Sequence, residues 1–178
     1  ARNGVTALIY AAIGGSEAVT KVLLHHGVDV AAVNKHGCTA LMVAAKRGHV
    51  AVAKLLLDYG ADVAAANEEG STALMAAAKG GHEEVTKLLL DHGADVAAAD
   101  IYGVTALKES ALGGHVAVTQ LLLENGADVA AAARNGVTAL IYAAIGGSEA
   151  VTKVLLHHGV DVAAANEEGS TALMAAAK

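Results

Sequence analysis

The chain has 178 residues, a formal net charge of −6 and 54% hydrophobic residues, so it is not a disordered polypeptide. The acidic balance argues against a nucleic-acid-binding surface, which usually shows as a basic stripe. The mean hydropathy is positive (+0.47), yet glycine and charged residues interrupt every apolar run well before the roughly 18 residues of a membrane span. We therefore expect neither nucleic acid nor a membrane as a partner. The single cysteine, Cys38, excludes an internal disulfide and favours a cytoplasmic, intracellular location.

One repeat period covers the whole chain. The tripeptide Thr-Ala-Leu recurs every 33 residues, and residues 1–32 are identical to residues 133–164. No linker or second composition interrupts the period, which predicts a single domain over residues 1–178. The units are 1–33, 34–66, 67–99, 100–132 and 133–165, followed by a partial unit at 166–178.

Each unit is predicted to contain two short helices. In the first unit, one helix follows Thr6, whose hydroxyl can cap it, and ends at the Gly14-Gly15 pair. A second, amphipathic helix follows Ser16 and ends before Gly27. The segment that leads into the next unit is bounded by glycine and rich in valine, which is typical of an extended arm and a tight turn. One such unit cannot bury its own apolar face, so neighbouring units must stack.

These residues closely resemble the ankyrin repeat. The resemblance implies a mainly α solenoid of stacked helix-turn-helix units with short β-hairpin tips, which acts as a protein-interaction module without catalysis or cofactor. The chain departs from the family pattern in two ways. Alanine replaces the proline of the Thr-Pro-Leu-His signature in all six units, and its histidine is replaced by Ile9, Met42, Met75, Lys108, Ile141 and Met174. The hydrogen-bonding side chains of the signature are thus missing.

Two groups of residues suggest chemistry, a Ser-Lys pair and the histidines, but each is better explained by a structural role. Lys108 and Ser110 in "LKESALGG" could form a Ser-Lys hydrolase pair, the remote alternative function, but a polar helix surface or a slightly mispacked unit explains them better. The histidines at the Gly-His positions, His49, His82 and His115, are expected to serve the turn and its packing. No spacing of cysteine or carboxylate supports a zinc site. We predict no catalytic residue, no metal and no cofactor.

The variable positions lie at the tips and at the ends of the first helices. By resemblance, these positions face a concave groove that binds a protein partner. The predicted partner-binding residues are Lys35, His36, Lys46, Arg47, Glu68, Glu69, Ile101, Tyr102, Val104, Leu112, Val137 and Ile145. Further carried-over positions are Arg2, Asn3, Val5, Ile13, Cys38, Ser71, Lys79, Arg134 and Asn135. We expect the six apolar residues of units four and five to form one patch, with Tyr102 as its anchor.

Two alternatives stay open. Uniform alanine replacements and copied units are also typical of an engineered scaffold or a self-assembling unit without a natural ligand. The outer face of unit one and the residues Leu173 and Met174 have no covering neighbour in the sequence, which predicts end-to-end self-association. Cys38 is predicted to be exposed on a hairpin tip.

Overall fold

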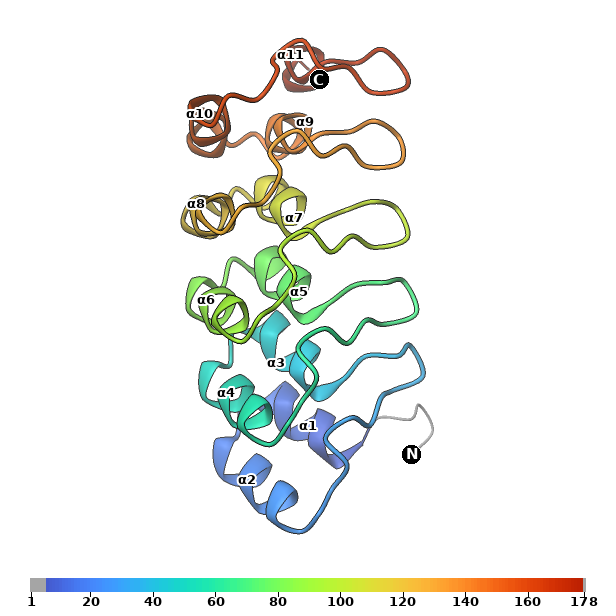
Figure 1. The fold of residues 1–178 in the computed structure, drawn as a ribbon, viewed down its shortest axis with the longest axis vertical. Helices are drawn as coiled ribbons and strands as arrows, with labels where there is room; N and C mark the ends of the chain where they lie inside the picture. The colour runs from blue at the N-terminus through green and yellow to red at the C-terminus, as the bar shows by residue number, and fades with distance from the viewer. Residues whose placement is uncertain (1–5, 178) are drawn as a thin grey trace.

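The computed structural model describes residues 6–177, which form two rows of stacked helices (Figure 1). The described part contains the following eleven helices: α1 (Ala7–Gly14), α2 (Glu17–His25), α3 (Ala40–Arg47), α4 (Val50–Asp58), α5 (Ala73–Gly80), α6 (Glu83–Asp91), α7 (Ala106–Leu112), α8 (Val116–Glu124), α9 (Ala139–Ile145), α10 (Glu149–His157) and α11 (Ala172–Ala176). Each odd-numbered helix packs on the odd-numbered helices before and after it, and the even-numbered helices α2 to α10 do the same. The predicted solenoid of stacked helix-turn-helix units is confirmed.

Side-chain caps start many of the helices, as the sequence predicts. The Thr6 hydroxyl accepts a hydrogen bond from the Ile9 N–H at 3.2 Å, and the Ser16 hydroxyl accepts one from the Val19 N–H at 3.3 Å. Such a cap satisfies one of the backbone donors that a helix leaves unpaired at its first turn. Thr105, in front of α7, makes no such bond. Thr138, in front of α9, makes none either. The first helices of units four and five therefore lack the side-chain cap that the first helices of the other units have.

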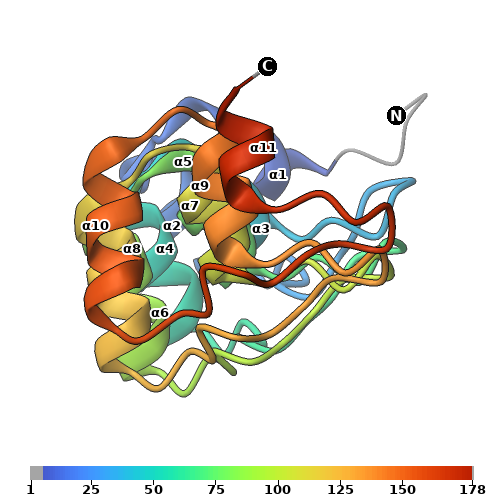
Figure 2. The same ribbon diagram turned by 90° about the horizontal axis from the view of Figure 1, so that it is seen from above.

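The connections between units project to one side of the stack as hairpin-like tips (Figure 2). Their β pairing is limited to isolated antiparallel bridges at Ala66–Thr72, Ala99–Thr105 and Ala165–Thr171. An asparagine or aspartate at the start of a tip holds its turn together, because the side-chain oxygen accepts hydrogen bonds from backbone N–H groups of the same tip. The Asn67 carboxamide oxygen, for example, accepts from the N–H groups of Glu69 and Ser71 at 3.0 and 2.8 Å.

The core consists mainly of leucine, valine and alanine, with a few isoleucine and methionine side chains, in keeping with a chain that has no phenylalanine or tryptophan. Ala44, Ala45, Ala77 and Ala78 are fully buried between neighbouring first helices. Small side chains at these places let the helix axes approach closely, so that each unit's apolar face is covered by the next unit. No helix among residues 6–177 combines the length and the apolar character required to cross a membrane.

One expectation about unit four is wrong. Lys108 and Ser110 do not form a polar helix surface, because their side chains are 1% and 0% exposed. The Lys108 ammonium donates to the Gly103 carbonyl oxygen at 2.8 Å, and Ser110 Oγ lies 3.0 Å from Thr119 Oγ1. Burial lowers the pKa of Lys108 below its ordinary value, against the opposing fields of Asp100 and Asp128. Both side chains point into the stack because α7 keeps the helical register of the other units.

Candidate functional site: a groove over units two and three

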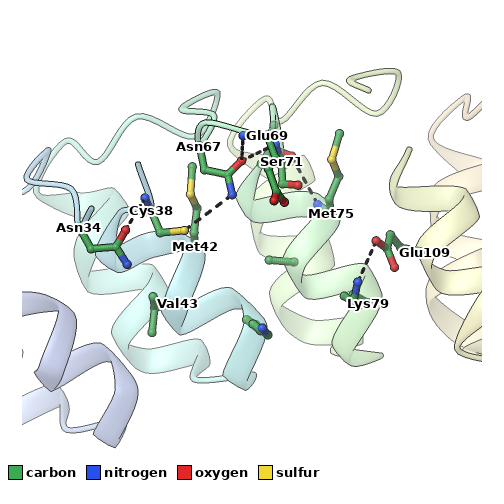
Figure 3. Close-up of a pocket in the computed structure, with 13 residues that line it drawn as sticks. Asn34, Cys38, Met42, Val43, Asn67, Glu69, Ser71, Met75, Lys79 and Glu109 are labelled. Carbon is green, nitrogen blue, oxygen red and sulfur yellow. Dashed lines mark hydrogen bonds and ion pairs between the residues drawn. The ribbon is translucent and has the colours of Figure 1, made fainter. Parts of the chain in front are cut away.

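A groove of about 370 Å³ runs along the first helices and tips of units two and three (Figure 3). Met42 and Met75 form its floor and are 5% and 4% exposed. Val43 on α3 and Ala76 on α5 are partly exposed and line the same groove. An apolar floor with polar groups around it is the usual composition of a binding groove.

Asn67 fixes the wall of the groove on the side of the tips. Its carboxamide oxygen is occupied by two backbone donors of its own tip, which leaves the amide nitrogen to point toward unit two. That nitrogen donates to Cys38 Sγ at 3.7 Å. The prediction that Cys38 is exposed is wrong, because this side chain is half-buried. The two tips thus present a defined edge along the groove.

Charged residues stand at the opposite side, where the first helices end. Lys79 Nζ lies 3.1 Å from Glu109 Oε1, and the two side chains are 60% and 17% exposed. The pair links unit three to unit four and holds the Glu109 carboxylate at the edge of the groove. Lys46, one unit earlier, is exposed at the end of α3. The groove therefore combines an apolar floor with two lysines at its edge, Lys46 and the ion-paired Lys79.

The structure places the predicted charged residues around this groove. Four of them are exposed on successive tips, namely Lys35, His36, Glu68 and Glu69. Adjacent tips are tied together by a backbone bond from the Glu68 N–H to the His36 carbonyl oxygen at 3.2 Å. Lys46 and Glu69 line the groove directly, whereas Arg47 is exposed at the last position of α3.

The six apolar residues predicted to form one patch in units four and five do not come together. Val137 is 6% exposed and lies in a small buried cluster with Ala133 and Ile141, so it cannot belong to an exposed patch. Ile101 and Tyr102 are exposed on the tip before α7, and Val104 beside them is half-buried.

The remaining two residues lie at the far ends of helices. Leu112 ends α7 and Ile145 ends α9, and both are exposed. A helix of this length spans about 10 Å, which separates these two side chains from the tip that precedes α7. The expected patch is therefore two separate exposed pairs, Ile101 with Tyr102 and Leu112 with Ile145.

Sequence reasoning missed one row of groove residues. Position 10 of each unit lies on the first helix, near the predicted positions but not among them. Its occupants in the described residues are Tyr10, Val43, Ala76, Glu109, Tyr142 and Ala175. This position holds four different residue types in the six units, more than any buried position beside it, and this variation was the available signal. Burial, Glu109 and Asp100 together raise the pKa of Tyr142.

The histidines at the Gly-His positions serve as framework, as predicted. His82 Nε2, for example, lies 3.1 Å from the carbonyl oxygen of Lys46 in the preceding unit. Among residues 6–177, no three histidine, cysteine, aspartate or glutamate side chains gather into a metal site. Ser110 Oγ is buried and bonded to the Leu107 carbonyl oxygen and to Thr119, so a substrate cannot reach it in this arrangement.

Comparison with known proteins agrees with this architecture. The family model described as "Ankyrin repeats (3 copies)" matches residues 1–67, 64–133 and 130–178. A comparison with curated protein sequences gave no match. Three predicted contact residues of unit one, Arg2, Asn3 and Val5, lie outside the described residues 6–177. Two rows of stacked helices, tips on one side and a family match over the full length lead to one conclusion: the chain belongs to the ankyrin-repeat family.

Proposed function

We propose that the chain is a non-catalytic protein-interaction module that binds a segment of a partner protein in the groove over units two and three. Ankyrin repeats are generally protein–protein interaction modules, which supports the class of function. The groove itself supports the place, because it joins an apolar floor at Met42 and Met75 to the fixed edge made by Asn67. Tyr102 and Ile101, on the next tip along, extend the contact surface toward unit four.

The groove favours an extended segment with one apolar side chain and one carboxylate. An apolar side chain would pack against Val43 and Ala76, and the carboxylate would lie near Lys46, which has no ion-pair partner among the described residues. A few buried anchors inside a polar rim usually supply most of the binding energy of such an interface. The single observation that carries the proposal is this groove of about 370 Å³ over units two and three.

Selection of peptides tests the proposal without a known partner. The full chain is immobilised and panned against a phage-displayed library of random 16-residue peptides. We expect the selected peptides to bind at least tenfold more weakly to the Ala76→Arg variant, a loss of about 1.4 kcal/mol, because the new side chain fills the groove. Ala51→Arg is the matched control, since Ala51 is an exposed alanine on α4, in the other row of helices.

The outcomes separate a binding module from an inert scaffold. Failure to select any peptide, or equal loss of binding in Ala51→Arg and Ala76→Arg, contradicts the proposed groove. Circular dichroism of both variants must show the parental melting temperature, so that lost binding is not lost folding. If the chain is an engineered scaffold without a ligand, no peptide should be selected.

We also propose that the polypeptide of residues 1–178 associates with itself end to end. An apolar pocket of about 470 Å³ lies among α9, α10 and α11. Leu173, Leu156 and Val162 line it and are 81%, 43% and 61% exposed. At the other end, Tyr10, Val19 and Leu23 line a shallow apolar surface on α1 and α2. Stacking of one copy on the next would cover both surfaces.

Sedimentation velocity over a range of protein concentrations measures this association. We expect the weight-average sedimentation coefficient to rise with concentration, and Leu173→Glu to abolish the rise because it places a charge in the contact. The parent chain remaining a monomer at millimolar concentration would refute the end-to-end contact.

A further inference from the structure

Three of the four junctions between complete units contain an imidazole bridge. A histidine in front of the second helix contacts the carbonyl oxygen near the end of the preceding unit's first helix. The Nε2-to-oxygen distances are 3.4 Å for His49 and Ile13, 3.1 Å for His82 and Lys46, and 3.1 Å for His115 and Lys79. The bond requires the tautomer that carries the proton on Nε2. Each bridge satisfies a carbonyl that the helix leaves unpaired at its end.

The junction between unit four and unit five has no such bridge. Serine occupies the histidine position, and the Ser148 hydroxyl instead accepts from the Val151 N–H of its own helix at 3.3 Å. The carbonyl oxygen of Leu112, which corresponds to that of Lys79 one unit earlier, receives no imidazole. The place of the ring is taken by backbone. The ring of His115 lies against Gly113 of its own unit, whereas the carbonyl group of Leu112 itself lies against Gly146, the corresponding glycine of unit five.

The same junction lacks other contacts found earlier in the stack. Ala133 occupies the tip position where Asn67 and Asp100 bind two backbone N–H groups. Thr138, like Thr105 one unit earlier, makes no cap bond, and its hydroxyl is in addition buried without a hydrogen-bond partner. The ion pair of Lys79 and Glu109 across the preceding junction has no counterpart, because the equivalent residues are Leu112 and Tyr142. One backbone bond, from the Arg134 N–H to the Tyr102 carbonyl oxygen at 2.9 Å, still joins the tips.

We infer that the junction between units four and five is the point at which the stack opens. The stability of a solenoid is a sum of unit and interface contributions, so local unfolding starts at the weakest interface. Units five and six, residues 133–177, therefore detach as one segment while units one to four stay folded. This opening leaves the groove over units two and three on the part of the stack that stays folded.

Hydrogen exchange of the intact chain followed by mass spectrometry locates the opening. Amides of α9 and α10 are expected to exchange at least tenfold faster than amides of α7 and α8, as a step and not as a gradual increase toward the end. Residues 1–32 and 133–164 give peptides of equal mass, so only peptides that begin before residue 133 or end after residue 164 report on unit five. A smooth gradient through α8 and α9, or equal protection of both, overturns the inference.

Restoring the bridge supplies the second test. In Ser148→His the Leu112 carbonyl group must move away from Gly146, as at the earlier junctions, for the imidazole to bond it. We expect exchange in α9 then to slow about fivefold, the effect of one net hydrogen bond. The substitution also removes the Ser148 cap, and Ser16→His measures that loss alone. Ser16 caps α2 in an identical local sequence, but no unit before unit one lies among the described residues to offer it a carbonyl. His82→Ser removes the bridge between units two and three, and we expect it to create a second opening at that junction. If Ser148→His and Ser16→His change exchange equally, or His82→Ser leaves the exchange pattern unaltered, the bridge does not decide where the stack opens.

Discussion

The Leu74→Ala variant is expected to lose about 2–5 kcal/mol of unfolding free energy, the range seen when a buried leucine is cut back to alanine. Leu74 is 1% exposed, in the middle of the stack between α3 and α7. Its side chain contributes to the continuous core that neighbouring units build together. Chemical denaturation monitored by circular dichroism measures the change in midpoint and slope.

The chain contains its own control for this prediction. Residues 166–178 repeat residues 67–79, so Leu173 has the same local sequence as Leu74. Leu173 is 81% exposed, and Leu173→Ala should change the unfolding free energy by less than about 0.5 kcal/mol at concentrations where the chain is monomeric. Similar losses in the two variants would mean that local sequence, and not stacking, stabilises the units.

Replacement of Lys108 by methionine is expected to stabilise the protein at neutral pH by about 1–3 kcal/mol, because a charged ammonium no longer has to be buried. Methionine already occupies this position in two neighbouring units, as Met42 and Met75, and fits there with little exposure. The bond from Lys108 Nζ to the Gly103 carbonyl oxygen compensates for part of the burial. Differential scanning calorimetry of the two proteins gives the difference. A lower melting temperature for Lys108→Met would show that this bond outweighs the cost of burying the charge.

The stability gained by Lys108→Met should disappear in alkali. Burial lowers the folded-state pKa of Lys108 below the ordinary value of 10.5, so between these two values the unfolded chain binds the extra proton. The unfolding free energy of the parent therefore rises with pH across this interval, and the contribution of Lys108 to the pH dependence is absent in the variant. Tyr142, whose pKa is raised, is present in both proteins, so its contribution largely cancels in the difference. A difference between parent and variant that is constant from neutral pH to pH 10.5 would contradict the burial of a charged Lys108.

The period of 33 residues was enough to predict the stack, because helix caps, helix ends and apolar faces recur in register along the chain. What the period could not predict is how one substitution acts across a junction. Lys108 reads as polar in the sequence, yet the helical register turns it inward. Val137 reads as a variable tip residue in the sequence. In the structure it is buried in an apolar cluster with Ala133, which stands where other tips have a hydrogen-bonding asparagine or aspartate.

The groove was only partly predictable for a similar reason. Lys46 and Glu69 could be chosen because variable positions of the repeat mark the concave surface. Val43 and Ala76 are chemically ordinary, and only the packing of α3 beside α5 shows that they line the same groove. The apolar residues of unit four were chosen by composition, but the length of α7 separates its tip from its far end.

Alkylation of Cys38 offers the most direct test of the groove as the binding surface. Cys38 is the one cysteine of the chain and lines the groove beside Met42 and Asn67. Its rate of reaction with a maleimide is measured with and without a saturating amount of a peptide selected on the full chain. We expect the bound peptide to slow the reaction at least tenfold, and chain already alkylated at Cys38 to lose its binding of the peptide. An unchanged rate of alkylation under saturating peptide would place the partner elsewhere and contradict the groove as the binding surface.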